Sequence, residues 1–235
     1  MRGFLLLLIF LILPFPSWAT YRIAVDPGHG GDDKGAVYQG IKEADVALEI
    51  SRKLYQLLKK DPQYQTLLLR HGDKDLSLEE RVKMAKAFKS DLFISIHANA
   101  HQDARAKGSE FYIQNQLPMD EEKLFLAHQE HQLDKSDQNK KLGDIESILS
   151  DIKKGQRILK SYELSRHLRK NWPRQKKSQM IRQGPFFVLS QNEVPAVLVE
   201  VGYLSNAQER EQLTQPSVQK DLAHRIYKAI KAYRQ

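Results

Sequence analysis

The stretch Tyr21–Gly31 has the sequence YRIAVDPGHGG and begins the alternation of strands, loops and helices that runs through the chain. Its first five residues are mostly apolar and rich in β-formers, so they predict a short strand, whereas the Asp-Pro-Gly-His-Gly-Gly that follows must form a turn. His29 lies inside this turn, where glycines allow the backbone to come close to a ligand. The stretch therefore predicts a strand that ends in a glycine-rich loop around a histidine.

Downstream of this loop, predicted helices and strands alternate. Apolar residues recur at helical spacing from Glu43 until Asp61-Pro62 interrupts them, and Ser77 with Glu80 forms a capping box at the start of another helix. Predicted helices cover residues 43–58, 77–90 and 217–233, and further strands cover 64–69, 92–96, 109–114, 186–189 and 195–201. This alternation predicts a single α/β/α domain of three layers with a mostly parallel central sheet.

A polar stretch from Pro118 to Arg182 interrupts the alternation. It is rich in Lys, Gln and Glu and mostly helical in pattern, but it is too poor in apolar residues to form an independent domain. Residues Ile145, Ile148, Leu149 and Ile152 share one helical face, as do Leu164 and Leu168 on a later helix. We therefore expect a helical insertion, or a pair of surface helices, within a domain that spans residues 20–235.

The first 19 residues differ in kind from the rest. Arg2 provides a positive charge, Phe4–Leu13 is an unbroken apolar run, and small residues lead to Ala19, an order that is typical of a secretory signal peptide. The run is shorter than the roughly 20 residues of a membrane-spanning helix. We expect cleavage after Ala19 and a periplasmic or otherwise exported protein with no stable membrane span. An uncleaved N-terminal anchor is the alternative.

Composition limits the chemistry that is available. The 235-residue chain has no cysteine, so any metal must be held by His, Asp or Glu, and disulfides and a cysteine nucleophile are excluded. The formal net charge is +8, and removal of Arg2 with the signal lowers it by one to +7. A basic exported protein can be attracted to cell-wall strands or to nucleic acid. Because no nucleic-acid-binding motif is found, we expect no nucleic-acid partner.

Three polar residues lie where predicted strands end or a helix begins. His29 and His97 each follow a strand, and Glu43 begins the helix after the glycine-rich loop. Each residue alone has a structural explanation, since a histidine at a strand end is more often structural and a glutamate at a helix start compensates the dipole. Sites in such sheets lie beyond the carboxyl ends of the strands. Together, two His and one Glu therefore predict a Zn²⁺ site with an open position for water.

Glu200 interrupts the apolar strand 195–201. Burial of an unpaired carboxylate is costly, so one interpretation is a buried salt bridge, for example to Arg70. The functional interpretation is a general base beside a metal-bound water.

Four segments resemble those of the zinc-dependent N-acetylmuramoyl-L-alanine amidases, a family that includes cell-separation and autolysin amidases. The segments are VDPGHGG (25–31), KEADVALEIS (42–51), SIHANA (95–100) and VPAVLVEVGYLSN (194–206), in the right order over nearly all of the mature chain. The resemblance implies that His29, Glu43 and His97 bind Zn²⁺ and that Glu200 is catalytic. It also implies hydrolysis of the amide between the lactyl group of N-acetylmuramic acid and L-alanine of the peptidoglycan stem peptide, in wall remodelling or daughter-cell separation.

The chain departs from the family pattern at two places. Leu69–Asp73 replaces a stretch that is commonly similar to Thr-Arg-Asp, and Lys86 replaces an asparagine that commonly follows the alanine at Ala85. His71 and His101 are possible additional ligands, although the predicted ligand set is complete without them.

Members of the family that act in cell separation carry a helical insertion at the place of the polar stretch. In them it covers the site and donates a carboxylate to the zinc until an activator removes it. The resemblance implies that Glu130 is the autoinhibitory carboxylate, with Glu146 as second choice; alternatively, both are solvated surface charges. It also implies an exported activator that acts on the insertion, and we expect the protein to be a monomer. A non-catalytic peptidoglycan-binding protein on the same fold, or a zinc peptidase that cuts within the stem peptide, remains an alternative function.

Overall fold

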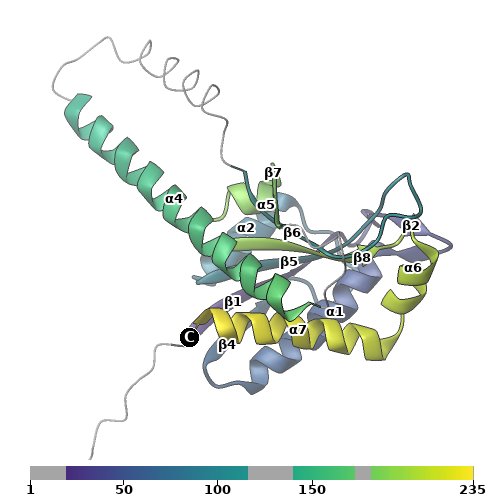
Figure 1. The fold of residues 1–235 in the computed structure, drawn as a ribbon. Helices are drawn as coiled ribbons and strands as arrows, with labels where there is room; N and C mark the ends of the chain where they lie inside the picture. The colour runs from purple at the N-terminus through teal and green to yellow at the C-terminus, as the bar shows by residue number, and fades with distance from the viewer. Residues whose placement is uncertain (1–19, 116–139, 173–180, 235) are drawn as a thin grey trace, which may run out of the picture.

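A six-stranded sheet with the strand order β4-β1-β5-β8-β6-β7 forms the middle layer of the protein (Figure 1). The computed structural model describes residues 20–115, 140–172 and 181–234. The strands are β1 (Tyr21–Pro27), β4 (Tyr64–Leu68), β5 (Leu92–Asn99), β6 (Glu110–Gln114), β7 (Ile181–Gly184) and β8 (Ala196–Tyr203), and β2 (Val37–Tyr38) pairs with β3 (Ile41–Lys42) in a separate hairpin. Strands β4, β1, β5 and β8 are parallel, whereas β6 runs antiparallel to β8 and pairs in parallel with β7.

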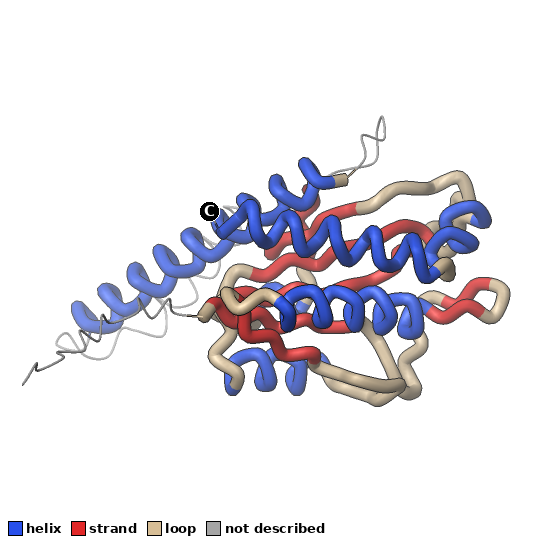
Figure 2. The backbone as a smooth tube through the Cα atoms, turned by 90° about the horizontal axis from the view of Figure 1, so that it is seen from below, coloured by secondary structure: helices blue, strands red, loops and turns tan. Residues whose placement is uncertain are grey.

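Helices cover both faces of the sheet, which confirms the predicted three-layer α/β/α fold. One face packs against α1 (Glu43–Lys60), α4 (Lys140–Asn171) and α7 (Pro216–Arg234), and the other packs against α2 (Leu78–Ala87) and α5 (Phe187–Ser190). A further short helix, α6 (Ala207–Leu213), follows β8. The alternation of faces along the strands explains the two cores: Ile23 and Val25 face the first layer of helices, whereas Ala24 faces the second. Figure 2 shows the long helices packed over one face of the sheet.

Helix α4 changes its environment along its length. Its C-terminal part contributes the fully buried Leu164 and Leu168 to the main core, and the adjoining Trp172 stacks edge-on against Phe111 of β6 with 5.2 Å between ring centroids. Its N-terminal part extends beyond the rest of the domain (Figures 1 and 2), and there Ile152 is 51% exposed. The expectation of surface helices is therefore wrong for the C-terminal part, because one continuous helix carries the later apolar residues into the core.

Two predicted elements around the insertion are corrected by the structure. The sequence predicts a strand at 186–189, but Phe187–Ser190 forms helix α5, in which the backbone N–H groups of Leu189 and Ser190 both donate to the carbonyl oxygen of Phe186. A short apolar run cannot distinguish a buried strand from a buried helical turn. The C-terminal boundary predicted for the helical stretch 118–182 is also wrong, because Ile181 and Arg182 belong to strand β7, which pairs with β6.

The predicted signal peptide, residues 1–19, lies outside the described residues. Among the helices that the structure describes, none is long and apolar enough to cross a membrane.

Candidate active site

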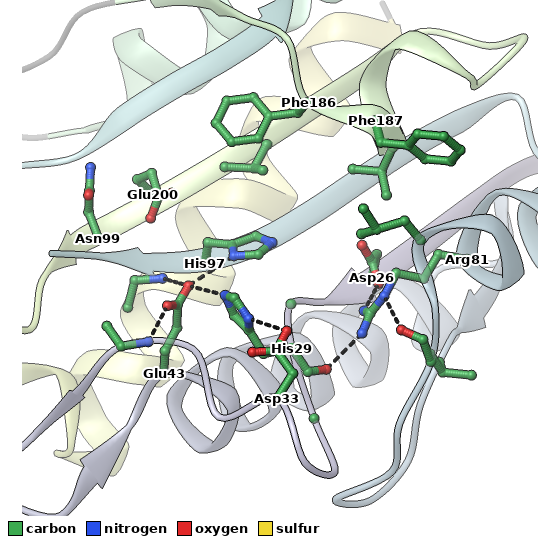
Figure 3. A pocket seen from close by; sticks show the side chains of 18 of the residues that line it. Asp26, His29, Asp33, Glu43, Arg81, His97, Asn99, Phe186, Phe187 and Glu200 are labelled. Carbon is green, nitrogen blue, oxygen red and sulfur yellow. Dashed lines mark hydrogen bonds and ion pairs between the residues drawn. The ribbon is translucent and has the colours of Figure 1, made fainter.

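Three side chains from separate segments meet at the carboxyl end of the parallel strands (Figure 3). His29 comes from the loop after β1, Glu43 from the first turn of α1 and His97 from β5. One ligand atom from each lies within 4.8 Å of the others. Glu43 Oε1 is 3.1 Å from His29 Nε2 and 2.9 Å from His97 Nδ1. Two imidazoles and a carboxylate that converge on one point form a donor set that fits Zn²⁺.

The ring of His29 is oriented by a residue that the sequence analysis did not identify. Its Nδ1 lies 2.7 Å from Asp33 Oδ2, so the other ring nitrogen is directed toward Glu43. The loop closes on itself here because the backbone N–H of Gly30 donates to the carbonyl oxygen of Asp33 at 2.7 Å. A carboxylate behind a metal-ligating imidazole fixes its tautomer and orientation, which gives Asp33 a supporting role in the site.

The carboxylate of Glu43 is held from all sides and is 6% exposed. Besides the two imidazoles, its Oε1 accepts a hydrogen bond from the backbone N–H of Ala98 at 3.1 Å, and its Oε2 accepts one from Ala36 at 3.0 Å. Glycines create the space for this arrangement, because a Cβ atom at Gly28 would overlap the ring of His97. Glycine at position 28 is thus a steric requirement of the site.

Because of these contacts, the pKa values of His29, Glu43 and Glu200 shift in different directions or for different reasons. Burial opposes charge on His29, but hydrogen bonds to the carboxylates of Glu43 and Asp33 outweigh it and raise the pKa of His29 to about 9. Burial alone would raise the pKa of Glu43, yet the two imidazoles lower it well below its usual range. Glu200 behaves in the opposite way, because burial raises its pKa to about 7.

Glu200 lies beside this cluster on β8, in register with His97 on β5. It is 8% exposed, and its Oε2 has no hydrogen-bond partner among the described residues. The alternative of a salt bridge to Arg70 is wrong, because the guanidinium of Arg70 donates to backbone carbonyls. Glu200 is therefore a buried carboxylate beside the cluster, with one oxygen that no described residue hydrogen-bonds.

A cavity of about 760 Å³ opens over these residues and includes His29, Glu43, His97 and Glu200 in its lining. Phe186 and Phe187 line it on the side opposite His29, and the ring of Phe186 is itself held edge-on by Tyr112, with 5.0 Å between centroids (Figure 3). This aromatic wall is not predicted from the sequence, because a strand at 186–189 would orient the two rings differently from the helix that forms there. A substrate in the cavity would meet an apolar surface on one side and the polar cluster on the other.

The other predicted site residues do not join the cluster. The ring of His71 packs edge-on against Tyr55, and His101 Nδ1 accepts a hydrogen bond from the backbone N–H of Asp103 at 3.0 Å. Glu130 lies outside the described residues, and so does the side chain of Glu146.

Comparison with known proteins finds the same family of enzymes by profile and by sequence identity. The profile of the family described as N-acetylmuramoyl-L-alanine amidase (Amidase_3) matches residues 23–232. The amidase AmiC of Escherichia coli O6:H1 is 31% identical over 225 residues, which cover 90% of this chain and 52% of AmiC. AmiA of Escherichia coli K12 is 32% identical over 219 residues, which cover 90% of this chain and 75% of AmiA.

Among solved structures, the catalytic domain of the amidase CwlV from Bacillus (Paenibacillus) polymyxa is 27% identical, with a TM-score of 0.69 over 91% of this chain and 98% of that domain. The chain spans about half the length of two of the curated relatives that it matches, one of which is AmiC. The match of the family profile to nearly the whole described domain shows that the chain belongs to the N-acetylmuramoyl-L-alanine amidase family.

Proposed function

We propose that the protein is a zinc-dependent amidase that hydrolyses the bond between the lactyl group of N-acetylmuramic acid and L-alanine of the peptidoglycan stem peptide. The observation that carries the proposal is the convergence of His29, Glu43 and His97 beside the unpaired carboxylate oxygen of Glu200. The names of AmiC, AmiA and CwlV support the same substrate and bond.

In this mechanism His29, Glu43 and His97 hold Zn²⁺, and Asp33 keeps the ring of His29 in the required orientation. When bound, the metal supplies Lewis-acid polarisation and makes water nucleophilic near neutral pH. Glu200, which lines the cavity, accepts the proton of the attacking water and then donates it to the nitrogen of the departing L-alanine. The lactyl carbonyl carbon gains the hydroxyl group, the C–N bond breaks, and a carboxylic acid and a free amine are formed.

The experiment is digestion of purified peptidoglycan by the zinc-loaded protein, with products identified by mass. Free stem peptides that begin with L-alanine are expected. Fragments cut inside the stem peptide would instead favour the zinc peptidase, and zinc binding without any product would favour the non-catalytic wall-binding protein.

The proposal places the activity in the cell envelope, where its substrate is found, after cleavage of residues 1–19 as a secretory signal. It also includes the regulatory role of the insertion, in which Glu130 occupies the zinc site until an exported activator binds.

The regulatory role predicts a gain of activity when the plugging carboxylate is removed. Replacement of residues 118–138 by a flexible Gly/Ser linker, or the single change Glu130→Gln, should raise the rate of peptidoglycan digestion without an activator. Glu121→Gln, in the same segment, is the matched control. An unchanged rate in both Glu130→Gln and the linker variant would argue against autoinhibition by this segment.

A further inference from the structure

A buried guanidinium lies behind the candidate metal centre without a carboxylate partner. Arg70 follows β4 and is 2% exposed. Its Nε donates to the carbonyl oxygen of Pro27 at 3.0 Å, and its Nη1 donates to that of Gly72 at 3.1 Å. Its Nη2 donates to two carbonyl oxygens, those of Gly28 at 2.7 Å and Ala44 at 2.8 Å. Among the described residues, no hydrogen bond of Arg70 goes to a carboxylate, so this side chain organises backbone.

The two carbonyls that share Nη2 belong to the segments that supply two members of the metal cluster. Gly28 immediately precedes His29, and Ala44 immediately follows Glu43. One nitrogen of Arg70 thus connects the loop after β1 to the first turn of α1. Because the ligand atoms of His29 and Glu43 are only 3.1 Å apart, a small shift between these segments would change the geometry that a metal ion meets.

A second guanidinium holds the same loop from the other side. Arg81 of α2 is 4% exposed, and its Nη2 donates to the carbonyl oxygen of His29 at 2.8 Å. Its Nη1 forms an ion pair with Asp26 Oδ1 at 2.6 Å (Figure 3). The other oxygen of Asp26 accepts a hydrogen bond from Ser95 Oγ at 2.8 Å. Ser95 stands two residues before His97 on β5. Arg81 therefore connects the loop to the strand that carries the third cluster residue.

The loop needs such support because its own backbone is unfavourable. His29 has a φ of 56°, in the left-handed region that side chains with a Cβ disfavour. The carbonyl groups of residues 27, 28 and 29 all receive guanidinium N–H groups. A guanidinium presents five donors in a rigid plane, whereas the ammonium of lysine is a point charge that cannot hold several carbonyls at fixed directions.

We propose that Arg70 is a positioning residue of the metal centre, whose guanidinium fixes the loop of His29 relative to Glu43 and so raises the affinity of the site for Zn²⁺. This inference rests on the proposed function, because it takes these residues as metal ligands. Replacement of a residue that orients metal ligands without binding the metal itself typically lowers metal affinity by about 10–100-fold.

The test compares the wild-type protein with Arg70→Lys, Arg70→Met and the control Arg157→Met. Arg157 of α4 is partly buried and donates to Gln114 Oε1 at 2.9 Å, whereas the partners of Arg70 are carbonyls next to His29 and Glu43. The zinc dissociation constant is measured by competition with a chromophoric chelator, the ligand geometry by the visible spectrum of the Co²⁺-loaded protein, and the fold by the urea midpoint of the zinc-free protein.

Both Arg70 variants are expected to weaken zinc binding about tenfold or more and to change the Co²⁺ spectrum, whereas Arg157→Met should leave both unchanged even if it lowers the urea midpoint. Arg70→Lys keeps the charge and the apolar stem, so it decides the question if Arg70→Met fails to fold. A folded Arg70→Lys that binds zinc as tightly as the wild type, with an unchanged spectrum, would overturn the inference.

The same measurements separate this inference from the proposed function. A wild-type protein that binds no zinc would overturn both. A wild-type protein that binds zinc but releases no stem peptides would count against the proposed activity alone, and the dissociation constants of the Arg70 variants would still decide the positioning role.

Discussion

At the residue scale, the two carboxylates of the site differ because their partners differ. Glu43 is hydrogen-bonded by both imidazoles and by two backbone N–H groups, so its ionised form is stabilised. Glu200 is equally buried but has a free Oε2, and burial raises its pKa to about 7. Pairs of titratable groups whose environments separate their pKa values indicate different chemical roles, here a ligand and a proton carrier.

Glu200→Gln should retain zinc and the fold but lose at least about 100-fold in the rate of peptidoglycan digestion, because a side-chain amide cannot accept the proton of water. The measurements are zinc content and product release. Glu193→Gln, which changes an exposed glutamate, is the matched control. Normal turnover by Glu200→Gln would show that this residue is not the general base.

Gly28→Ala should abolish tight zinc binding, because the added Cβ would overlap the ring of His97. Gly72→Ala is the control, since no atom lies within 4 Å of a Cβ built at that position. Zinc titration of the two variants checks this prediction. Equal affinities would mean that the loop can move away from His97 at little cost.

At the element scale, α4 is a helix with two different environments. Its C-terminal part completes the core against β6 and α7, whereas its N-terminal part projects from the domain. Because of this division, only part of the insertion can be deleted without loss of core residues. Deletion of the whole stretch 118–182 would remove Leu164, Leu168 and the first residues of β7, so loss of activity in such a protein would report unfolding and not regulation.

Leu168→Ala should lower the free energy of unfolding by about 2–5 kcal/mol, because it leaves a cavity in the core. Leu159→Ala, on the same helix but 63% exposed, should change it by less than about 0.5 kcal/mol. Urea unfolding of both variants measures the difference. Similar values would indicate that α4 does not pack on the sheet in solution.

At the scale of the whole molecule, the metal site joins segments that are far apart in the chain. The loop after β1, the start of α1 and the end of β5 come together only in the folded protein. A ligand that binds only the folded state stabilises it in proportion to RT ln(1 + [L]/Kd). The stability of the protein is therefore linked to zinc.

Removal of zinc should make stability depend on pH between about 6.5 and 9. In the metal-free protein the pKa of His29 is raised from 6.5 to about 9, so its protonated form stabilises the fold fully below pH 6.5, and this contribution is lost as the pH rises through 9. Urea midpoints of chelator-treated protein should fall over this range, and those of His29→Gln should fall less. An equal fall in both proteins would exclude His29 as the source.

Local patterns in the sequence were sufficient for much of the architecture. The helical spacing after Glu43, the capping box at Ser77 and the apolar strand predicted at 195–201 are present in the structure, because periodicity and capping depend on neighbouring residues. The same patterns put His29 and His97 at the carboxyl ends of strands and Glu43 at the start of a helix, and the structure brings the three together. The topology of an alternating α/β chain places these ends at one edge of the sheet.

Other features depend on which distant segments pack together, and local patterns carry no information about that. The helix at Phe187–Ser190, the antiparallel direction of β6 and the burial of Leu168 are set by neighbours far along the chain. Arg70 is the clearest case. From the sequence it is a candidate partner for the charge of Glu200, but in the folded protein its guanidinium donates to carbonyls of the loop after β1, of Gly72 and of α1, because the fold brings these distant segments together around it.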